Sequence, residues 1–524
     1  MTPSTSHEEP AGGADPGEPR SVDPTPTTDS GHDGCINGNR AYRTSAVSAA
    51  ALQVGQGLLV NAISIPALAY IIRTLGPTAY GEWALASALA ALCTAVSSLG
   101  LRTTFVRAVA SAPHTASLLL AEQLALRMTL TVVMATGVLA VAVLLGYSRV
   151  VILCLLICEL ALLISVSSAA LMDTLQGLEQ FSITASASLA GGLVLTLLSV
   201  VAMLLRTGIV GLSVAYSTGP LVTFLVLLSA CRARGILVTM RCPIARGAKL
   251  LHEGRSIGLT NLCALVFQKG LLTILPRFLG MEMFGFFSAG IIPADRLYLV
   301  PDSLSTAFYP SIARAVGRDP VAARRLIFRH SVISLVISLP ILFCVSSIAD
   351  PLSAILFHQA QPTCAYVMRA SIWALFFISI SQPMVCALNA AGRYAEGARA
   401  GARALGAITV IAIVVIPFRG LEGACWVWVG RYALEAAFLL RPFLRNFAPA
   451  PNEYPWVAVS LSAAAILVPI AIRTLCPASS GLNWGSAASA VPIYLGVLLL
   501  FDVADCRRTL SRLYERVIVS IKCD

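Results

Sequence analysis

The chain is poor in charge, and above all in lysine. Only 12% of its 524 residues are Asp, Glu, Lys or Arg, and the lysines are Lys249, Lys269 and Lys522. A typical soluble domain is about 25% charged. Hydrophobic residues make up 57% of the chain, and the mean hydropathy is +0.80. This balance excludes a water-soluble enzyme, a disordered protein and a nucleic-acid-binding module, and predicts a chain that lies mostly in lipid.

The net charge of +11 comes without a nucleic-acid-binding pattern. No basic stripe with interleaved aromatic residues occurs, so we predict no nucleic-acid partner. In a membrane protein the placement of basic residues in loops matters more than their sum, because it sets the orientation of the chain.

Motifs for metals, cofactors and catalysis are also lacking. The 14 cysteines include no CxxC pair, and most lie inside apolar runs, where cysteine acts as a small hydrophobic residue. The six histidines are scattered, and no paired carboxylates occur in the expected external loops. The sequence therefore predicts no metal site, no cofactor, no catalytic residues and no enzyme.

Long apolar runs alternate with short polar breaks from about residue 46 onward. Runs of about 20 apolar residues are typical of membrane-spanning helices, since lipid leaves no partner for free backbone groups. We therefore predict an all-α polytopic membrane protein with about 14 spans: 48–72, 83–106, 125–147, 150–172, 183–205, 209–231, 256–276, 284–308, 331–349, 365–391, 399–418, 420–440, 455–473 and 485–503.

The spans divide the chain into regions of different character. With the N-terminus inside, most basic loop residues fall on the cytoplasmic side, as the positive-inside rule requires. Both termini are then cytoplasmic. The predicted regions are a disordered tail (1–45), an N-lobe of spans 1–6 (46–235), a basic linker (236–255), a C-lobe of spans 7–12 (256–445), spans 13–14 (446–505) and a basic tail (506–524).

The two predicted lobes share short sequence echoes. RTLGPTAYGEWAL (73–85) pairs with RFLGMEMFGFFSA (277–289), LQGLEQF (175–181) with LNAAGRY (388–394), and GIVG (208–211) with GLEG (420–423). The offsets are nearly equal, and six spans is an even number. Two six-helix lobes in parallel repeat are therefore predicted, an arrangement that transporters use to hold substrate between the halves.

These motifs carry a family resemblance. R-x-L-G-P-x-x-Y-G-x-W after the first span, LGLRTTFVRAVA, LQGLEQF, GFFSAG, FYPSIARA and LNAAGRYAEG resemble the polysaccharide flippases of the multidrug/oligosaccharidyl-lipid/polysaccharide exporter superfamily. The resemblance covers about residues 45–445. It implies a two-lobed fold of 14 helices, in which spans 1 and 7 face each other across a central cavity.

The resemblance also implies an activity and a place. A polyprenyl-diphosphate-linked oligosaccharide would cross the bacterial inner membrane for surface polysaccharide or exopolysaccharide synthesis, next to membrane lipid, polymerase and export machinery. Two alternatives stay open: a cation-coupled multidrug exporter of the same fold, and a membrane enzyme of polysaccharide assembly. The chain departs from the family in FQKGLLTIL of span 7, where an acid is common and only Lys269 is ionisable.

Basic residues inside spans are the candidate substrate-binding residues. A charge at mid-helix costs about 2.5–3.5 kcal/mol on insertion scales, so it needs a partner, a cavity or a function. Lys269 either meets phosphate in the cavity or extends toward the interface. Arg296 is a cavity candidate, because it cannot share a helix face with its neighbour Asp295. Arg431 either faces the cavity or pairs with Glu435 four residues on.

Other polar residues and prolines in the spans complete the set of candidates. Asp295 and Glu435 are candidates for ion or proton coupling, and the isolated Glu159 is either a protonated structural acid or a proton-coupling site. Gln53, Gln56 and Asn61 of span 1 form a polar stripe that either contacts sugars or joins helices. Pro66 and Pro276, near the ends of equivalent spans 1 and 7, are candidate hinges, because proline can kink a helix.

Overall fold

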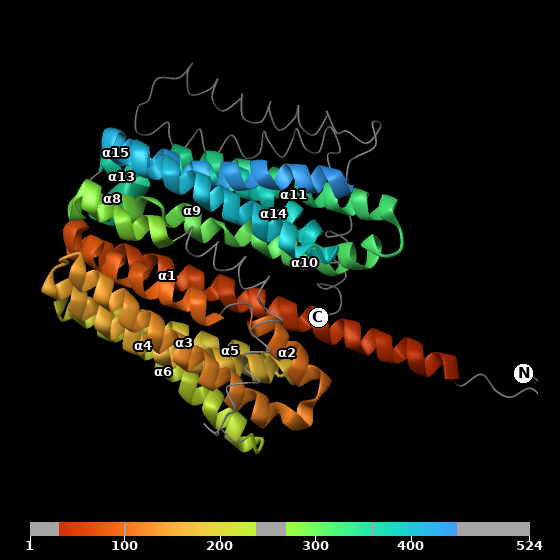
Figure 1. The fold of residues 1–524 in the computed structure, drawn as a ribbon. Helices are drawn as coiled ribbons and strands as arrows, with labels where there is room; N and C mark the ends of the chain where they lie inside the picture. Colours follow the sequence, from red (N-terminus) through yellow and green to blue (C-terminus); the bar gives the residue numbers. More distant parts are fainter. Residues whose placement is uncertain (1–30, 99–100, 237–268, 359–360, 448–524) are drawn as a thin grey trace, which may run out of the picture. The chain divides into compact units, whose positions relative to one another are not determined.

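The computed structural model describes residues 31–98, 101–236, 269–358 and 361–447 (Figure 1). All the secondary structure in these ranges is helical, and nine of the helices are long and apolar enough to cross a membrane. The predicted all-α, polytopic fold is confirmed. Spans 13 and 14 and most of span 7 lie outside the described residues, so the total of 14 helices stays a prediction.

The first half of the described chain forms one group of packed helices, here called the N-terminal bundle (residues 52–236). Its helices are α1 (Gly31–Ser98), α2 (Leu101–Ser111), α3 (Ala116–Leu144), α4 (Arg149–Gly177), α5 (Phe181–Leu204) and α6 (Gly208–Ala233), with a short 3-10 turn at Pro113–Thr115. α4 packs against α2, α3 and α6, and α6 packs against α5 (Figure 1). Buried leucines and alanines from these faces form their core.

α1 corresponds to the first two predicted spans. Its backbone leaves the helical conformation at Gly76, where φ is 76° and ψ is 171°. Glycine tolerates this left-handed φ, which an L-residue adopts only with strain. α1 begins at Gly31, inside the predicted tail 1–45. The chain divides into two units at this helix, Met1–Ala51 and Leu52–Asp524.

The second half forms the C-terminal bundle (residues 269–447). It contains a helical segment at 269–279, then α8 (Met281–Gly290), α9 (Ile292–Leu297), α10 (Leu299–Val316), α11 (Pro320–Ser347), α12 (Ala349–Phe357), α13 (Pro362–Ser371), α14 (Ala374–Ala390) and α15 (Tyr394–Phe447). α10, α11 and α14 pack against one another, and α15 packs against α14 (Figure 1).

Predicted span 8 and the long helix α15 of this bundle are interrupted. Span 8 is divided into α8, α9 and α10 by turns at Ile291 and Tyr298. Pro293 is at the start of α9, where its missing N–H and fixed φ suit a first helical turn. α15 loses helical geometry at Gly420, with φ 54° and ψ −125°. This is the position at which the sequence predicts the break between spans 11 and 12.

The two bundles repeat each other in backbone conformation. Positive φ occurs at Gly76 and Gly280, at Glu179 and Gly392, and at Gly208 and Gly420, three pairs that follow the sequence echoes. These paired turns support the parallel repeat that the echoes predict.

An aromatic contact is repeated in the same way. Trp83 meets Tyr216 edge-on, with ring centroids 6.1 Å apart, and Phe287 meets Trp428 edge-on, also at 6.1 Å. The echo RTLGPTAYGEWAL/RFLGMEMFGFFSA pairs Trp83 with Phe287, and the echo GIVG/GLEG pairs Tyr216 with Trp428. Within each bundle, the same pair of helices is therefore joined by an equivalent pair of aromatic side chains.

Candidate functional site

The two bundles touch at matched glycines. A Cβ placed on Gly81 would lie 2.5 Å from the carbonyl oxygen of Met281, and a Cβ on Gly285 would overlap the carbonyl of Pro77. The repeat pairs Gly81 with Gly285 and Pro77 with Met281. The contact is therefore reciprocal, and only the missing side chains let the backbones approach this closely.

A hydrogen bond also joins the bundles. Tyr147, in the turn between α3 and α4, donates its hydroxyl proton to the carbonyl oxygen of Thr273 over 3.0 Å. Burial raises the pKa of Tyr147, while the positive charge of Arg277 opposes this shift. The hydroxyl therefore stays protonated at neutral pH and remains a donor.

Basic side chains from two predicted cavity positions meet polar partners. Arg296 of α9 donates from its Nη1 to Oδ1 of Asn61 in α1 over 2.5 Å. The Nζ of Lys269 lies 4.0 Å from Oδ2 of Asp295, and both of these side chains are about a quarter exposed. The structure thus brings together Asn61 of span 1, the lysine of span 7 and the charged pair of span 8.

Both contacts start from α9, a six-residue helix between the turns at Ile291 and Tyr298. Asp295 and Arg296 are neighbours in this segment, and neighbours on a helix point in different directions. One contacts Lys269 and the other contacts Asn61.

Arg431 has a different environment, inside the C-terminal bundle. Its side chain is 3% exposed, and its guanidinium carbon lies 4.4 Å from the Trp428 ring centroid and 4.1 Å from that of Tyr432. Its Nη2 also donates to the Tyr432 hydroxyl. Glu435 is within electrostatic range of Arg431, as the i,i+4 spacing predicts.

The polar surroundings of Arg431 continue toward α9. Tyr298 accepts a hydrogen bond from Gln382 of α14 and is within electrostatic range of Arg431. Tyr432 is within electrostatic range of Asp295. Arg431 and Asp295 are thus both within electrostatic range of Tyr432.

The remaining predicted residues are more dispersed. Gln56 is half-buried in α1, whereas the side chain of Gln53 lies outside the described residues. Glu159 is buried in α4, and its Oε1 has no hydrogen-bond partner within the described part of the chain. Pro66 lies in the helical part of α1, ten residues before the turn at Gly76, and Pro276 is buried before Gly280.

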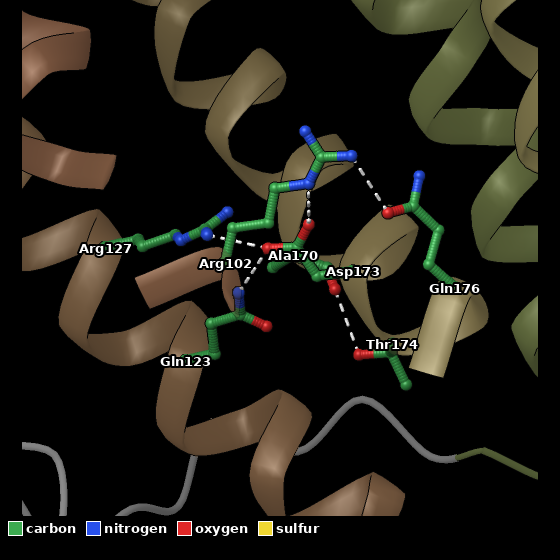
Figure 2. Close-up of polar contacts among 7 residues, drawn as sticks. All are labelled: Arg102, Gln123, Arg127, Ala170, Asp173, Thr174 and Gln176. Carbon is green, nitrogen blue, oxygen red and sulfur yellow. Dashed lines mark hydrogen bonds and ion pairs between the residues drawn. The ribbon is translucent and has the colours of Figure 1, made fainter. Parts of the chain in front are cut away.

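Sequence reasoning missed one cluster, centred on Asp173 of α4 (Figure 2). Asp173 is 3% exposed, and its Oδ2 accepts hydrogen bonds from Arg127 and Gln123 of α3, both over 2.7 Å. Arg102 of α2 has its Nε 3.7 Å from Oδ1 of Asp173 and donates to Oε1 of Gln176 over 3.1 Å. The cluster joins three helices of the N-terminal bundle.

A signal for this cluster was present in the sequence. Arg127 lies within predicted span 3, and an intramembrane arginine requires a partner. Asp173 lies one residue beyond the predicted end of span 4 at residue 172, so the predicted span does not include it. The structure extends α4 to Gly177 and turns Asp173 inward. The predicted end of span 4 is five residues short of the observed end of α4, and Asp173, the partner of Arg127, lies in that difference.

The fold is that of known transporters. The chain superposes on the structure "Lipid II flippase MurJ, inward closed conformation" with a TM-score of 0.61 and 11% identity, covering 84% of this chain and 98% of that one. The TM-score is 0.59 for an inward-facing multidrug resistance MATE family transporter of the MOP superfamily, at 14% identity and 76% and 97% coverage. The fold and the spans define a multi-pass membrane protein of this architecture.

The sequence narrows this class to a family. The family model described as "Polysaccharide biosynthesis protein" matches residues 70–366, more than half of the chain. The chain therefore belongs to this family, and the resemblance inferred from its motifs is confirmed. No curated protein has significant sequence similarity to the chain.

Proposed function

We propose that this protein is a flippase that moves undecaprenyl-diphosphate-linked oligosaccharide repeat units across the bacterial inner membrane. Family membership supports a role in polysaccharide synthesis, and the fold supports transport. The flippase among the structural neighbours is named for a lipid-linked substrate, lipid II. The repeat units would then supply surface polysaccharide or exopolysaccharide synthesis, next to a polymerase and export machinery.

The observation that carries the proposal is the contact between Arg296 and Asn61. It places a guanidinium from the second half of the chain against the polar stripe of the first half. The Arg296 side chain is exposed, so its donors are accessible. A guanidinium has five N–H donors in a planar fork that matches phosphate oxygens in pairs. A diphosphate is thus a suitable ligand for this position.

Lys269 would add a second positive charge to the diphosphate site. Its 4.0 Å separation from Asp295 is long for an ion pair, and both side chains are partly exposed. An arriving diphosphate could therefore replace Asp295 as the partner of Lys269. The sugars would contact Gln53, Gln56 and Asn61, while the undecaprenyl tail stays in lipid. Arg431 would hold the wall of the cavity through its aromatic contacts.

Alternating access would move the substrate through this cavity. The Gly81–Gly285 contact and the Tyr147–Thr273 hydrogen bond close one end of the path, which we assign to the outer side. Both termini are then cytoplasmic. Opening requires only that the substrate bind the two states with different affinities. Pro66 and Pro276 would allow spans 1 and 7 to bend.

The energy source would act through one of three acidic residues. In this scheme Asp295 leaves Lys269 and faces solvent when the diphosphate binds. Glu435 lies within electrostatic range of Arg431, and Glu159 is buried in α4. Each could bind a proton or a cation when its basic neighbour turns to the substrate. Replacing each with its amide and measuring transport under a proton or sodium gradient would identify the one that couples.

A flipping assay tests the proposal. The purified protein is placed in vesicles with a fluorescent undecaprenyl-diphosphate oligosaccharide, and the outer-leaflet label is quenched. Arg296→Ala and Lys269→Ala should each abolish flipping, whereas Arg149→Ala, at an exposed arginine that begins α4, should not. Normal flipping by both cavity variants would contradict the cationic path.

The same vesicles discriminate the alternatives. Efflux of a cationic dye without lipid flipping would indicate a multidrug exporter, which the likeness to MATE transporters allows. A chemically altered lipid-linked product would indicate an enzyme of polysaccharide assembly. Unaltered lipid in the opposite leaflet is the result that we expect.

A further inference from the structure

The Asp173 cluster has a counterpart in the C-terminal bundle. The buried side chains of α3 include Leu120, Leu124, Arg127 and Thr131, and those of α11 include Ala323, Ile327, His330 and Ser334, which have the same spacing. This register pairs Arg127 with His330. The clusters can therefore be compared residue by residue.

The other two helices of each cluster follow the same register. Phe105 and Val109 are buried in α2, and Phe308 and Ile312 occupy the matching places in α10, which pairs Arg102 with Ser305. The echo LQGLEQF/LNAAGRY pairs Asp173 with Cys386. The residues Arg102, Arg127 and Asp173 thus correspond to Ser305, His330 and Cys386.

The corresponding residues also touch one another in the C-terminal bundle. Ser305 Oγ lies 3.3 Å from His330 Nε2, and the Cys386 thiol donates to the carbonyl oxygen of Ser305 over 3.6 Å. The His330 ring stacks on Phe308 at 4.9 Å. In the N-terminal bundle, two arginines contact the carboxylate of Asp173. In the C-terminal bundle, the corresponding residues make hydrogen bonds without a carboxylate or an arginine, and such bonds are weaker.

The helices that carry the two clusters differ in continuity as well. α10, α11 and α14 contain interior prolines at Pro310, Pro340 and Pro383, whereas α2, α3 and α4 contain none. An interior proline removes one hydrogen bond of the helix and favours a kink. Both differences make this end of the C-terminal bundle the easier one to deform.

We infer that Arg102, Arg127 and Asp173 are positioning residues for transport: they lock one end of the N-terminal bundle into a rigid body, while the neutral counterpart Ser305–His330–Cys386 leaves the equivalent end of the C-terminal bundle free to bend. The consequence for transport rests on the proposed function. In each cycle the cytoplasmic opening is then produced by α10, α11 and α14, which move against the fixed end of α2, α3 and α4.

Matched spin-label pairs test this difference. Ser111→Cys and Ser182→Cys report on the N-terminal bundle, and Arg314→Cys and Ala395→Cys, at the corresponding positions, report on the C-terminal bundle; all four residues are exposed. Distance distributions are recorded for the full chain in nanodiscs, with and without undecaprenyl diphosphate. We expect a narrow, unchanged distribution for the first pair and a broader distribution that shifts with the lipid for the second.

Exchange of the two clusters provides the decisive variants. Arg102→Ser/Arg127→His/Asp173→Cys should broaden the N-terminal distribution, because it installs the neutral set. Ser305→Arg/His330→Arg/Cys386→Asp should narrow the C-terminal distribution and lower kcat of flipping without raising KM. If the charged triple variant does not fold, Pro310→Ala/Pro383→Ala provides the same test by restoring helix continuity.

The outcomes separate the inference from the proposed function. Equal widths for both pairs in the unaltered chain, or an N-terminal width unaffected by the exchange, would overturn the inference whatever the lipid does. A second outcome is that the widths of the two distance distributions differ and respond to the exchange, while undecaprenyl diphosphate shifts neither pair and no flipping occurs. This outcome would support the difference in rigidity and contradict the flippase.

Discussion

Gly81 and Gly285 occupy the same position in the two halves of the chain, and each is packed against the backbone that precedes the other. Gly81 faces the carbonyl of Met281, and Gly285 faces that of Pro77. A side chain on either glycine would enter a space already filled by main-chain atoms, which cannot rotate away. The closed contact of the bundles therefore depends on two missing methyl groups.

Gly81→Ala should weaken this closure without unfolding either bundle. Excess volume in a packed contact costs about 1–3 kcal/mol, and here the bundles can separate to relieve it. Each 1.4 kcal/mol is about a tenfold change in population. Labelling of Ala79→Cys, a partly buried position near the contact, by a membrane-impermeant maleimide should therefore accelerate by roughly tenfold.

Gly137→Ala is the control for this substitution. A Cβ at Gly137 of α3 would meet nothing within 4 Å, so the change adds the same methyl group in open space. It should leave labelling unchanged and favour the helix by up to about 1 kcal/mol. Equal labelling rates in Gly81→Ala and Gly137→Ala would show that the glycines do not hold the bundles together.

Removal of the Asp173 carboxylate should destabilise the protein severely. Arg127 is 4% exposed and hydrogen-bonds to Asp173, so Asp173→Ala leaves a buried guanidinium without its anion. Breaking a buried pair in this way costs about 3–5 kcal/mol. The melting temperature in detergent should fall clearly, and Arg127→Leu in the same chain should recover part of the loss by removing the uncompensated charge.

Glu422→Ala is the matched control for the loss of one acid. Glu422 lies 4.0 Å from Arg419, and both side chains are more than half exposed. Exposed ion pairs contribute less than about 1 kcal/mol. A loss of stability for Glu422→Ala as large as for Asp173→Ala would mean that burial does not determine the effect.

The fold could be predicted because lipid imposes a strong rule on sequence. Apolar runs of span length had to be helices, and the break at Gly420 was visible as a short polar interruption. The positions where helices end were harder to place. α4 continues to Gly177, past Asp173, whose carboxylate finds a cationic partner inside the bundle. Hydropathy alone treats such an acid as a loop residue.

The sequence identified the candidate residues of the site, but it did not predict which of them contact one another. Rare charges inside spans identified Lys269, Arg296 and Arg431 without any structure. The partners of Lys269 and Arg296 lie on other helices, and the turns of span 8 at Ile291 and Tyr298 leave only a proline as a local signal. The aromatic contacts of Arg431 with Trp428 and Tyr432 likewise depend on side-chain direction, which helical spacing does not specify.

Arg431→Lys should destabilise the C-terminal bundle although it keeps the charge. The planar guanidinium lies over two rings, and buried cation–π contacts contribute about 2 kcal/mol or more. Lysine has no planar group to stack and carries a more strongly hydrated ammonium. The melting temperature should fall, while Arg441→Lys at an exposed position should not change it. Equal melting temperatures would contradict a stabilising role for the stacked guanidinium.

Asn61→Asp should impair flipping more than Asn61→Ala. Asn61 accepts a hydrogen bond from Arg296, and a carboxylate there would turn this contact into an ion pair between opposite charges. Arg296 would then be neutralised and less available to a diphosphate, whereas alanine only removes an acceptor. In the vesicle assay Asn61→Asp should raise KM for the lipid-linked oligosaccharide, and Asn61→Ala should change it little. The reverse order would mean that Asn61, and not Arg296, holds the substrate.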